Sequence, residues 1–262
     1  MFPYFTLFGR QIPLYGTMAA VGMLLALVYL KLRTRRLPGP EEADVQLAFL
    51  FSALGAMVGA RLLWLGTVLP EFLAELPLLQ TEPLAFAYKY LSGGFVFYGG
   101  LYGALAGLVL YRRFSRGRSL AELLNLLFPC FPLIHGFGRI GCFCTGCCYG
   151  RETASPLGVV FHVSEVAPNG VPLLPVQLVE AGCELLLFAL CAALARRGRD
   201  GRHILGLWLV CYALLRFTLE FFRGDAARGF VGPLSLSQLL SIPTLLLGLW
   251  LLLRRTNRVD IT

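Results

Sequence analysis

The sequence has few charged residues, and this scarcity is its first informative feature. Only 15% of its 262 residues are charged and 57% are hydrophobic, whereas soluble domains have about 25% charged residues. No long polar stretch remains that could form a separate soluble domain. The apolar first ten residues lack a basic n-region and a small-residue cleavage site, so we expect no cleaved signal peptide.

Several apolar stretches approach the ~20 residues that a helix needs to cross the hydrocarbon core of a membrane. Lipid offers the backbone no hydrogen bonds, so such stretches form helices. We therefore predict an all-α integral membrane protein, a single domain over 1–262 with a small external loop and arm at 138–173. We expect about seven transmembrane helices, approximately at 12–31, 46–69, 93–111, 120–137, 174–195, 204–222 and 235–253. Segment 70–91 is predicted to be an external loop with room for an amphipathic helix.

Basic residues gather after alternate predicted spans, which predicts the orientation of the chain. These residues are Lys31, Arg33, Arg35, Arg36, Arg112, Arg113, Arg116, Arg118, Arg196, Arg197, Arg199, Arg202, Arg254, Arg255 and Arg258. The positive-inside rule makes their side cytoplasmic, with the N-terminus external and the C-terminus internal. They account for most of the net charge of +8. We therefore expect membrane lipid, and no nucleic acid, as a partner.

Three arginines lie at or near membrane depth. Arg61 and Arg216 fall inside predicted spans, and Arg139 follows one. An arginine there costs at least about 2.5 kcal/mol on insertion scales, so it needs a polar cavity, a partner or an anionic ligand. Glu220 lies one helical turn after Arg216 on the same face. That pair is consistent with either a structural ion pair or a functional site.

Glycine is concentrated in SGGFVFYGGLYGALAG, near the start of the predicted span 93–111, around Tyr98 and Tyr102. Gly103 and Gly107 have the spacing of a GxxxG helix-packing motif. The favoured interpretation is close helix packing, with the tyrosines in the aromatic belt.

The segment HGFGRIGCFCTGCCYGR, residues 135–151, is the strongest local signal. It combines His135 and Arg139 with four cysteines and five glycines. Such a composition predicts an irregular loop that lines a cavity at the membrane surface.

Six motifs occur in order along the chain. They are LYGTMAAVG around Tyr15, GARLLW around Arg61, GGFVFYGGLYG at 93–103, GRIGCFCTGCCYGR at 138–151, PVQLVEA at 175–181 and YALLRFTLEFFRGD at 212–225. In these motifs the chain resembles the phosphatidylglycerol–prolipoprotein diacylglyceryl transferases over nearly its full length. The resemblance implies an enzyme of the bacterial inner membrane that moves a diacylglyceryl group from phosphatidylglycerol to the lipobox cysteine of a lipoprotein precursor. Its implied partners are phosphatidylglycerol, the signal peptide of the precursor and membrane lipid, and no metal or nucleotide cofactor is required.

The resemblance also implies roles for individual residues. Arg139 and Arg216 would bind the phosphate, which suits the bidentate fork of a guanidinium. Glu220 would orient Arg216 or share its charge. The candidate substrate-binding residues are Tyr15, Arg61, Gly99, Gly100, Cys142, Gly150, Gln177, Glu180 and Tyr212.

The chain departs from the family pattern at the proposed catalytic base. Tyr98 stands where the family has a histidine, and a reference pKa near ~10 makes tyrosine a poor base at neutral pH. His135, one helical turn before Arg139, is the alternative base, because a histidine pKa of ~6.5 suits the task. A lone histidine near a helix end more often has a structural or capping role, so that interpretation of His135 stays open. The segment 152–173 is predicted to be a loop or small β-hairpin. Its His162, and His203 elsewhere in the chain, are weak candidates for a catalytic role.

A second departure lies in GRIGCFCTGCCYGR, which is similar to the family signature GR-x-GN-x-x-NGE-x-x-GR. The two asparagines and the glutamate of that signature are replaced here by Cys142, Thr145 and Cys147. Together with Cys144 and Cys148 these cysteines form a C-x-C-x2-C-C run. Disulfides that brace the loop are the leading interpretation. Metal binding together with His135 and a redox or acyl-carrying thiol are the alternatives, although the spacing matches no standard zinc motif. The remaining cysteines fall within spans and are predicted to be small apolar residues, namely Cys130, Cys183, Cys191 and Cys211.

Three functional classes remain open from the sequence. The first is the lipoprotein diacylglyceryl transferase. The second is a divergent paralogue that uses the same lipid cavity for a different acceptor or headgroup reaction. The third is a non-catalytic lipid-binding, thiol-redox or metal-binding membrane protein.

Overall fold

The computed structural model describes residues 3–35, 37, 39–92, 94–115, 117–225 and 230–254. It divides into two compact units, and each is described by itself. The first unit consists of Met1–Leu37 and Leu124–Thr262, and the second of Pro38–Leu123.

The prediction of an all-α membrane protein is confirmed. Within the described ranges, six helical segments are long and apolar enough to cross a membrane. They are Leu14–Thr34, Glu41–Thr67, Leu120–Thr145, Val176–Arg196, Gly201–Glu220 and Leu236–Leu253. The remaining predicted span, 93–111, corresponds to α6 (Phe97–Phe114), whose glycines, tyrosines and paired arginines reduce its hydropathy.

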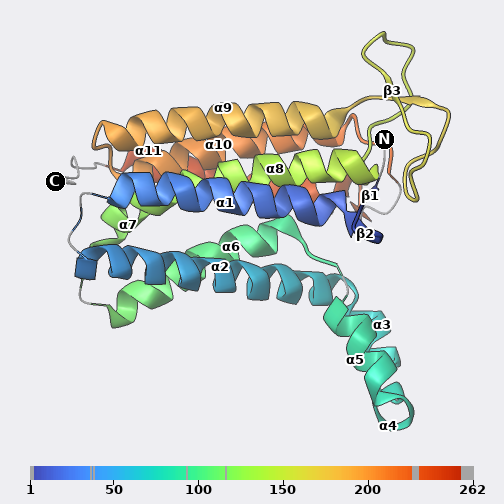
Figure 1. Ribbon diagram of the computed structural model, residues 1–262, viewed down its shortest axis with the longest axis horizontal. Helices are drawn as coiled ribbons and strands as arrows, with labels where there is room; N and C mark the ends of the chain where they lie inside the picture. The colour runs from blue at the N-terminus through green and yellow to red at the C-terminus, as the bar shows by residue number, and fades with distance from the viewer. Residues whose placement is uncertain are drawn as a thin grey trace. The chain divides into compact units, whose positions relative to one another are not determined.

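The first unit is a helical bundle. Its helices are α1 (Leu14–Thr34), α7 (Leu120–Leu127, shared with the second unit), α8 (Cys130–Thr145), α9 (Val176–Arg196), α10 (Gly201–Glu220) and α11 (Leu236–Leu253). Helix α8 packs between α1 and α9, and α10 packs between α9 and α11, so these five helices run side by side (Figure 1). Small residues allow the close approach. A Cβ atom on Gly206 would lie 3.0 Å from the backbone oxygen of Gly248.

Helix α8 extends further than predicted. The span predicted at 120–137 continues to Thr145, so 135–145 is helical and not an irregular loop. Two glycines of this stretch provide contact surfaces for neighbouring helices. Gly136 faces α9 near Leu185, and Gly141 faces Tyr15 of α1. Packing of this kind outweighs the low helix propensity of glycine.

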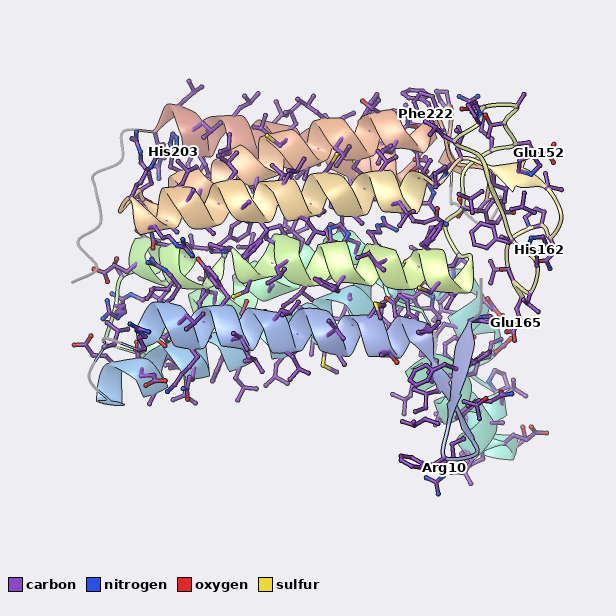
Figure 2. The ribbon with its side chains drawn as sticks, turned by 45° about the horizontal axis from the view of Figure 1, so that its top comes forward. Arg10, Glu152, His162, Glu165, His203 and Phe222 are labelled. Atoms are coloured by element: carbon purple, nitrogen blue, oxygen red, sulfur yellow. The ribbon has the colours of Figure 1, made fainter. Side chains whose placement is uncertain are left out.

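Irregular chain begins at the left-handed Gly146, which ends α8. The following arm contains the strands β3 (Val159–Val160) and β4 (Pro172–Leu173), which pair antiparallel, as predicted for a small hairpin. The arm has its own apolar cluster around Phe161 and Leu173, against which Phe143 of α8 packs. Figure 2 shows Glu152 and His162 of the arm at the opposite end of the bundle from His203.

Two further hairpins complete the first unit. β1 (Tyr4–Leu7) pairs with β2 (Arg10–Pro13). Both residues of the tight turn between them have positive φ, 51° at Phe8 and 74° at Gly9, which fits a two-residue hairpin loop. β5 (Phe230–Val231) pairs with β6 (Leu234–Ser235). Ser235 then begins α11 with a capping box closed by Gln238.

The second unit is built on α2 (Gly39–Thr67) and α6. Between them lie the short helices α3 (Leu69–Ala74), α4 (Leu78–Thr81) and α5 (Pro83–Ser92). The segment 70–91, predicted as an external loop with room for an amphipathic helix, is mostly helical. Lys89 holds α5 to α3 by an ion pair with Glu71 at 2.7 Å and binds Glu75, just after α3, at the same distance.

Glycine brings α2 and α6 into backbone contact, as the GxxxG pattern predicted. A Cβ atom on Gly103 would lie 2.2 Å from the backbone oxygen of Gly55, and one on Gly99 would lie 2.3 Å from that of Gly59. Gly107 approaches the backbone of Phe51 in the same way. The two helices can be this close only because no side chain stands between them.

We predict that Gly103→Ala lowers the free energy of unfolding by about 1–3 kcal/mol, because the new methyl group overpacks a backbone contact. Reversible unfolding in mixed micelles measures this change. Gly66→Ala is the matched control in α2, since its Cβ atom meets nothing within 4 Å. Equal stability of the two variants would contradict the proposed glycine interface.

Candidate active site

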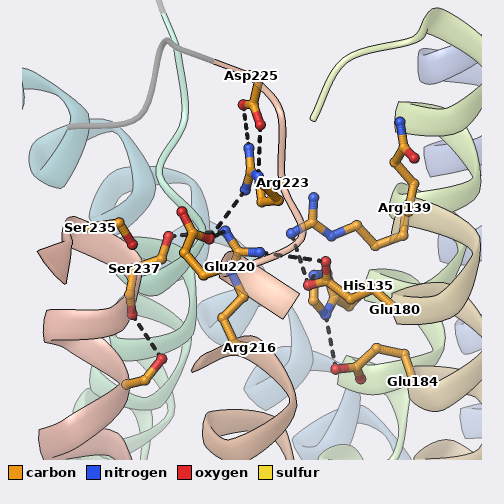
Figure 3. A network of polar contacts seen from close by, with 12 residues as sticks. His135, Arg139, Glu180, Glu184, Arg216, Glu220, Arg223, Asp225, Ser235 and Ser237 are labelled. Carbon is orange, nitrogen blue, oxygen red and sulfur yellow. Dashed lines mark hydrogen bonds and ion pairs between the residues drawn. The ribbon is translucent and has the colours of Figure 1, made fainter. Parts of the chain in front are cut away.

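A buried ion network joins three helices of the first unit (Figure 3). Arg139 of α8 donates a hydrogen bond to Glu180 of α9 at 2.8 Å. The other carboxylate oxygen of Glu180 lies 3.8 Å from Arg216 of α10. Only 9% of Arg139, 3% of Glu180 and 4% of Arg216 is exposed. Both arginines suspected from the sequence in this unit therefore face one shared carboxylate.

The network continues toward the end of α10. Arg216 pairs with Glu220 at 2.8 Å, as the spacing of four residues predicted, and donates to the Ser237 hydroxyl at 3.0 Å. Arg223 lies 3.8 Å from Glu220 and donates to Asp225 at 2.9 Å. Burial lowers the pKa of Arg223, but the hydrogen bond to Asp225 outweighs it, so the pKa is raised. The Arg223 guanidinium is therefore a permanent positive charge.

His135 is embedded in this network. Its Nδ1 lies 3.2 Å from Glu184, and its Nε2 lies 3.9 Å from Glu180. The second oxygen of Glu184 accepts a hydrogen bond from Trp208 at 3.0 Å. Trp208 stacks on Tyr212, with ring centroids 4.7 Å apart, and Tyr212 packs edge-on to the imidazole. One carboxylate and two aromatic rings thus orient His135.

The Nε atom of Arg139 is buried and has no hydrogen-bond partner among the described residues. Its guanidinium therefore has donor capacity that Glu180 does not use. A phosphate oxygen is a suitable acceptor, because charge-assisted bonds to guanidinium are strong and directional.

The cysteine run forms a cluster of sulfur atoms. The sulfur atoms of Cys142, Cys147 and Cys148 lie within 4.8 Å of one another. All eight cysteines of the chain are free thiols in the structure, so the predicted disulfides are not found. His135 contacts Glu184 and is not a member of the cluster, nor is Cys144.

Cys148 has an unusual setting. Its φ of 58° is left-handed, which is uncommon for a residue other than glycine. Hydrogen bonds with Cys142 and Cys147 lower the pKa of its thiol, and the nearby Arg139 and Arg223 add to this effect. Cys148 is therefore the cysteine most readily deprotonated in the cluster.

The predicted residues Gly150 and Gln177 hold the turn that carries these cysteines. Gln177 of α9 donates to the Cys147 carbonyl at 2.9 Å. The Gly150 amide donates to the Leu174 carbonyl at 3.1 Å, and a Cβ atom at this glycine would lie 2.4 Å from that same oxygen. Tyr15, at the start of α1, packs on Gly141 beside Cys142.

The other predicted residues belong to the second unit. The Tyr98 side chain is buried and stacks near Tyr102, with ring centroids 6.5 Å apart. Arg61 donates to the carbonyls of Gly94, at 3.2 Å, and Leu91, and lies over the Phe95 ring. Gly99 packs on α2, whereas Gly100 has more room, since its Cβ atom would be 3.6 Å from the nearest atom.

The family model described as prolipoprotein diacylglyceryl transferase matches residues 3–254. The chain belongs to this family. A phosphatidylglycerol–prolipoprotein diacylglyceryl transferase of Clostridium tetani is 32% identical over 94% of this chain and 94% of its own. The transferase 2 of Clostridium perfringens is 33% identical over 94% and 91%. The transferase of Geobacter sulfurreducens is 35% identical over 90% and 87%.

The matched region includes both units, so every candidate residue lies inside the part shared with the diacylglyceryl transferase family. Sequence reasoning missed Glu184, which is fully buried. Its signal was available, because a glutamate within an apolar span demands an explanation just as an arginine does. It also missed Trp208 and Ser237, for which no pattern in the sequence pointed to the network.

We predict that Glu180→Gln lowers the free energy of unfolding by about 3–5 kcal/mol, because it leaves two buried arginines without their shared counter-charge. Unfolding in mixed micelles measures the effect. Glu152→Gln is the control, since Glu152 is exposed on the arm. Wild-type stability of Glu180→Gln would contradict the idea that Glu180 holds the network together.

Proposed function

We propose that this multi-pass membrane protein transfers a diacylglyceryl group from phosphatidylglycerol to the cysteine thiol of a prolipoprotein. The observation that carries this proposal is the family match over 3–254. It is supported by the buried arrangement of Arg139 and Arg216 on either side of Glu180. The acceptor cysteine belongs to the signal-peptide region of the precursor.

The reaction requires the sulfur of the acceptor to attack the glycerol carbon that carries the phosphate. A carbon–sulfur bond forms, the carbon–oxygen bond breaks, and glycerol phosphate leaves with the electron pair. Arg139 and Arg216 would bind the phosphate and stabilise the negative charge that develops on the leaving group. Glu180 and Glu220 would orient the two guanidinium groups. No metal or nucleotide is needed as the source of the transferred group.

His135 is the proposed proton acceptor. Its contact with Glu184 at 3.2 Å holds the ring in place, and an imidazole is the side chain best suited to accept a proton near neutral pH. Tyr98 is the weaker candidate, because a neutral phenol is a poor base.

We also propose that the protein lies in a bacterial inner membrane with the arm external. Arg33, near the end of α1, donates to the Asn125 side chain and to the Ala195 carbonyl near the end of α9. The basic ends of α1 and α9 therefore lie together, which supports this orientation under the positive-inside rule. His203 lies at the end of the bundle opposite the arm in Figure 2. Other predicted orientation residues lie outside the described residues, namely Arg36, Arg116, Arg255 and Arg258.

The decisive assay uses purified protein with phosphatidylglycerol vesicles and a peptide that contains the acceptor cysteine. It measures both the mass gain of the peptide and the release of glycerol phosphate. Both signals together support the transferase. Phospholipid cleavage without peptide modification would indicate a different acceptor, and absence of turnover would contradict an enzymatic role.

We expect Arg216→Ala to reduce kcat/KM in this assay by at least about 100-fold, because a positioned donor to the developing charge is lost. Arg202→Ala is the matched control on the same helix. Arg202 pairs with Asp200, and its side chain is 42% exposed. If Arg216→Ala retained wild-type turnover, the phosphate-binding role would be wrong.

We expect His135→Gln to lower kcat by about 100-fold or more, with little change in KM for the lipid, because proton transfer is impaired. Tyr98→Phe should retain more activity, and His162→Gln on the arm serves as the histidine control. A larger loss in Tyr98→Phe than in His135→Gln would transfer the role of base to the tyrosine.

A further inference from the structure

The sulfur cluster of Cys142, Cys147 and Cys148 has the dimensions of a metal site. A zinc ion binds cysteine sulfur at ~2.3 Å in tetrahedral geometry, which places pairs of sulfur ligands ~3.8 Å apart. All three sulfur atoms already lie within 4.8 Å of one another. Small side-chain movements would bring them to ligand distances.

The backbone around the cluster is shaped to bring these sulfur atoms together. Gly146, at φ 79°, reverses the chain at the end of α8, and Cys148 adopts φ 58° two residues later. A non-glycine residue persists in this conformation only where its surroundings enforce it, and such residues concentrate at functional sites. Gln177 fixes the turn through the Cys147 carbonyl. Thr145 donates to the Cys147 sulfur at 3.4 Å.

The positive charges near the cluster would stabilise three thiolates. Arg139 and Arg223 both act electrostatically on Cys148. A zinc ion with four thiolate ligands carries a net charge of about −2, and two guanidinium groups offset it. Because Arg139 also faces Glu180, the cluster directly adjoins the ion network.

We propose that Cys142, Cys147 and Cys148 bind a zinc ion with three thiolates and that the acceptor thiol takes the open fourth position. Three protein ligands with one open position is the arrangement of catalytic zinc sites. The role of the fourth ligand rests on the proposed function, because it requires a thiol substrate. Zinc binding by the three cysteines does not.

The zinc site would supply the acceptor as a thiolate. A thiol that coordinates zinc loses its proton, which passes to water and from there to His135, two turns away on the same face of α8. The sulfur electron pair then forms the bond to the glycerol carbon, and the carbon–oxygen electron pair leaves with glycerol phosphate. The thioether product is a weaker ligand than a thiolate and leaves the ion. No electron is gained or lost overall.

The first experiment measures metal content. Protein purified in detergent with a phosphine reductant is incubated with zinc chloride, freed of excess metal and analysed by mass spectrometry. We expect about one zinc per chain in the wild type and less than about a tenth of that in Cys142→Ser, Cys147→Ser and Cys148→Ser. Cys144→Ser is the matched control and should retain the zinc, because Cys144 lies in the same run but outside the cluster.

Wild-type protein provides a test that does not depend on whether the variants fold. Cobalt(II) chloride added in place of zinc should produce the intense near-ultraviolet absorption of sulfur-to-cobalt charge transfer. The metal site would be overturned if the wild type gave no charge-transfer band, or if all four serine variants bound equal amounts of zinc. It would also be overturned if protein whose free thiols were alkylated during isolation contained a disulfide between cysteines of the cluster.

The open fourth position is tested with the cobalt-loaded protein. A peptide with the acceptor cysteine should increase the charge-transfer absorption by about one third, since a fourth thiolate joins three. The same peptide with serine at that position should leave the spectrum unchanged. An unchanged spectrum with both peptides would overturn the acceptor role. Failure of the transferase assay with intact cobalt binding would instead count against the proposed function.

Discussion

The buried carboxylate of Glu180 is the interaction on which the site and its bundle both depend. It accepts a hydrogen bond from Arg139 and faces Arg216, so a single acidic group balances cations from α8 and α10. Each buried ion loses several kcal/mol of hydration, which only well-placed partners recover. The same contacts that hold the helices in register therefore also bring the two arginines that we propose to bind phosphate to one place.

Helix α8 arranges the chemistry along one of its faces. His135, Arg139 and Cys142 occur at spacings of four and three residues, so they lie on successive turns of one stripe. The rise of a helix separates the first from the last by about 10 Å. The proposed proton acceptor, one proposed phosphate ligand and a thiol thus follow one another along α8, and the left-handed turn at Gly146 adds Cys147 and Cys148 at its end.

In the second unit, glycine residues bring the backbones of the two long helices into direct contact. Glycines on α2 and α6 face one another so closely that a single methyl group would not fit at Gly103. This packing explains the spacing of the glycines without any ligand. The substrate-binding role of Gly99, Gly100 and Arg61 stays a prediction that rests on the family resemblance.

The sequence by itself determined the membrane class, most of the spans, the buried arginines and the family, because hydropathy, charge and motif order are local properties. It could not determine that α8 continues through the glycine-rich segment to Thr145, since packing overrides propensity there. Only the tertiary structure decided that Glu180 accepts a hydrogen bond from Arg139, 41 residues away, and that three of four neighbouring cysteines form one cluster. These contacts depend on the rotation and approach of separate helices, which no local pattern in the chain encodes.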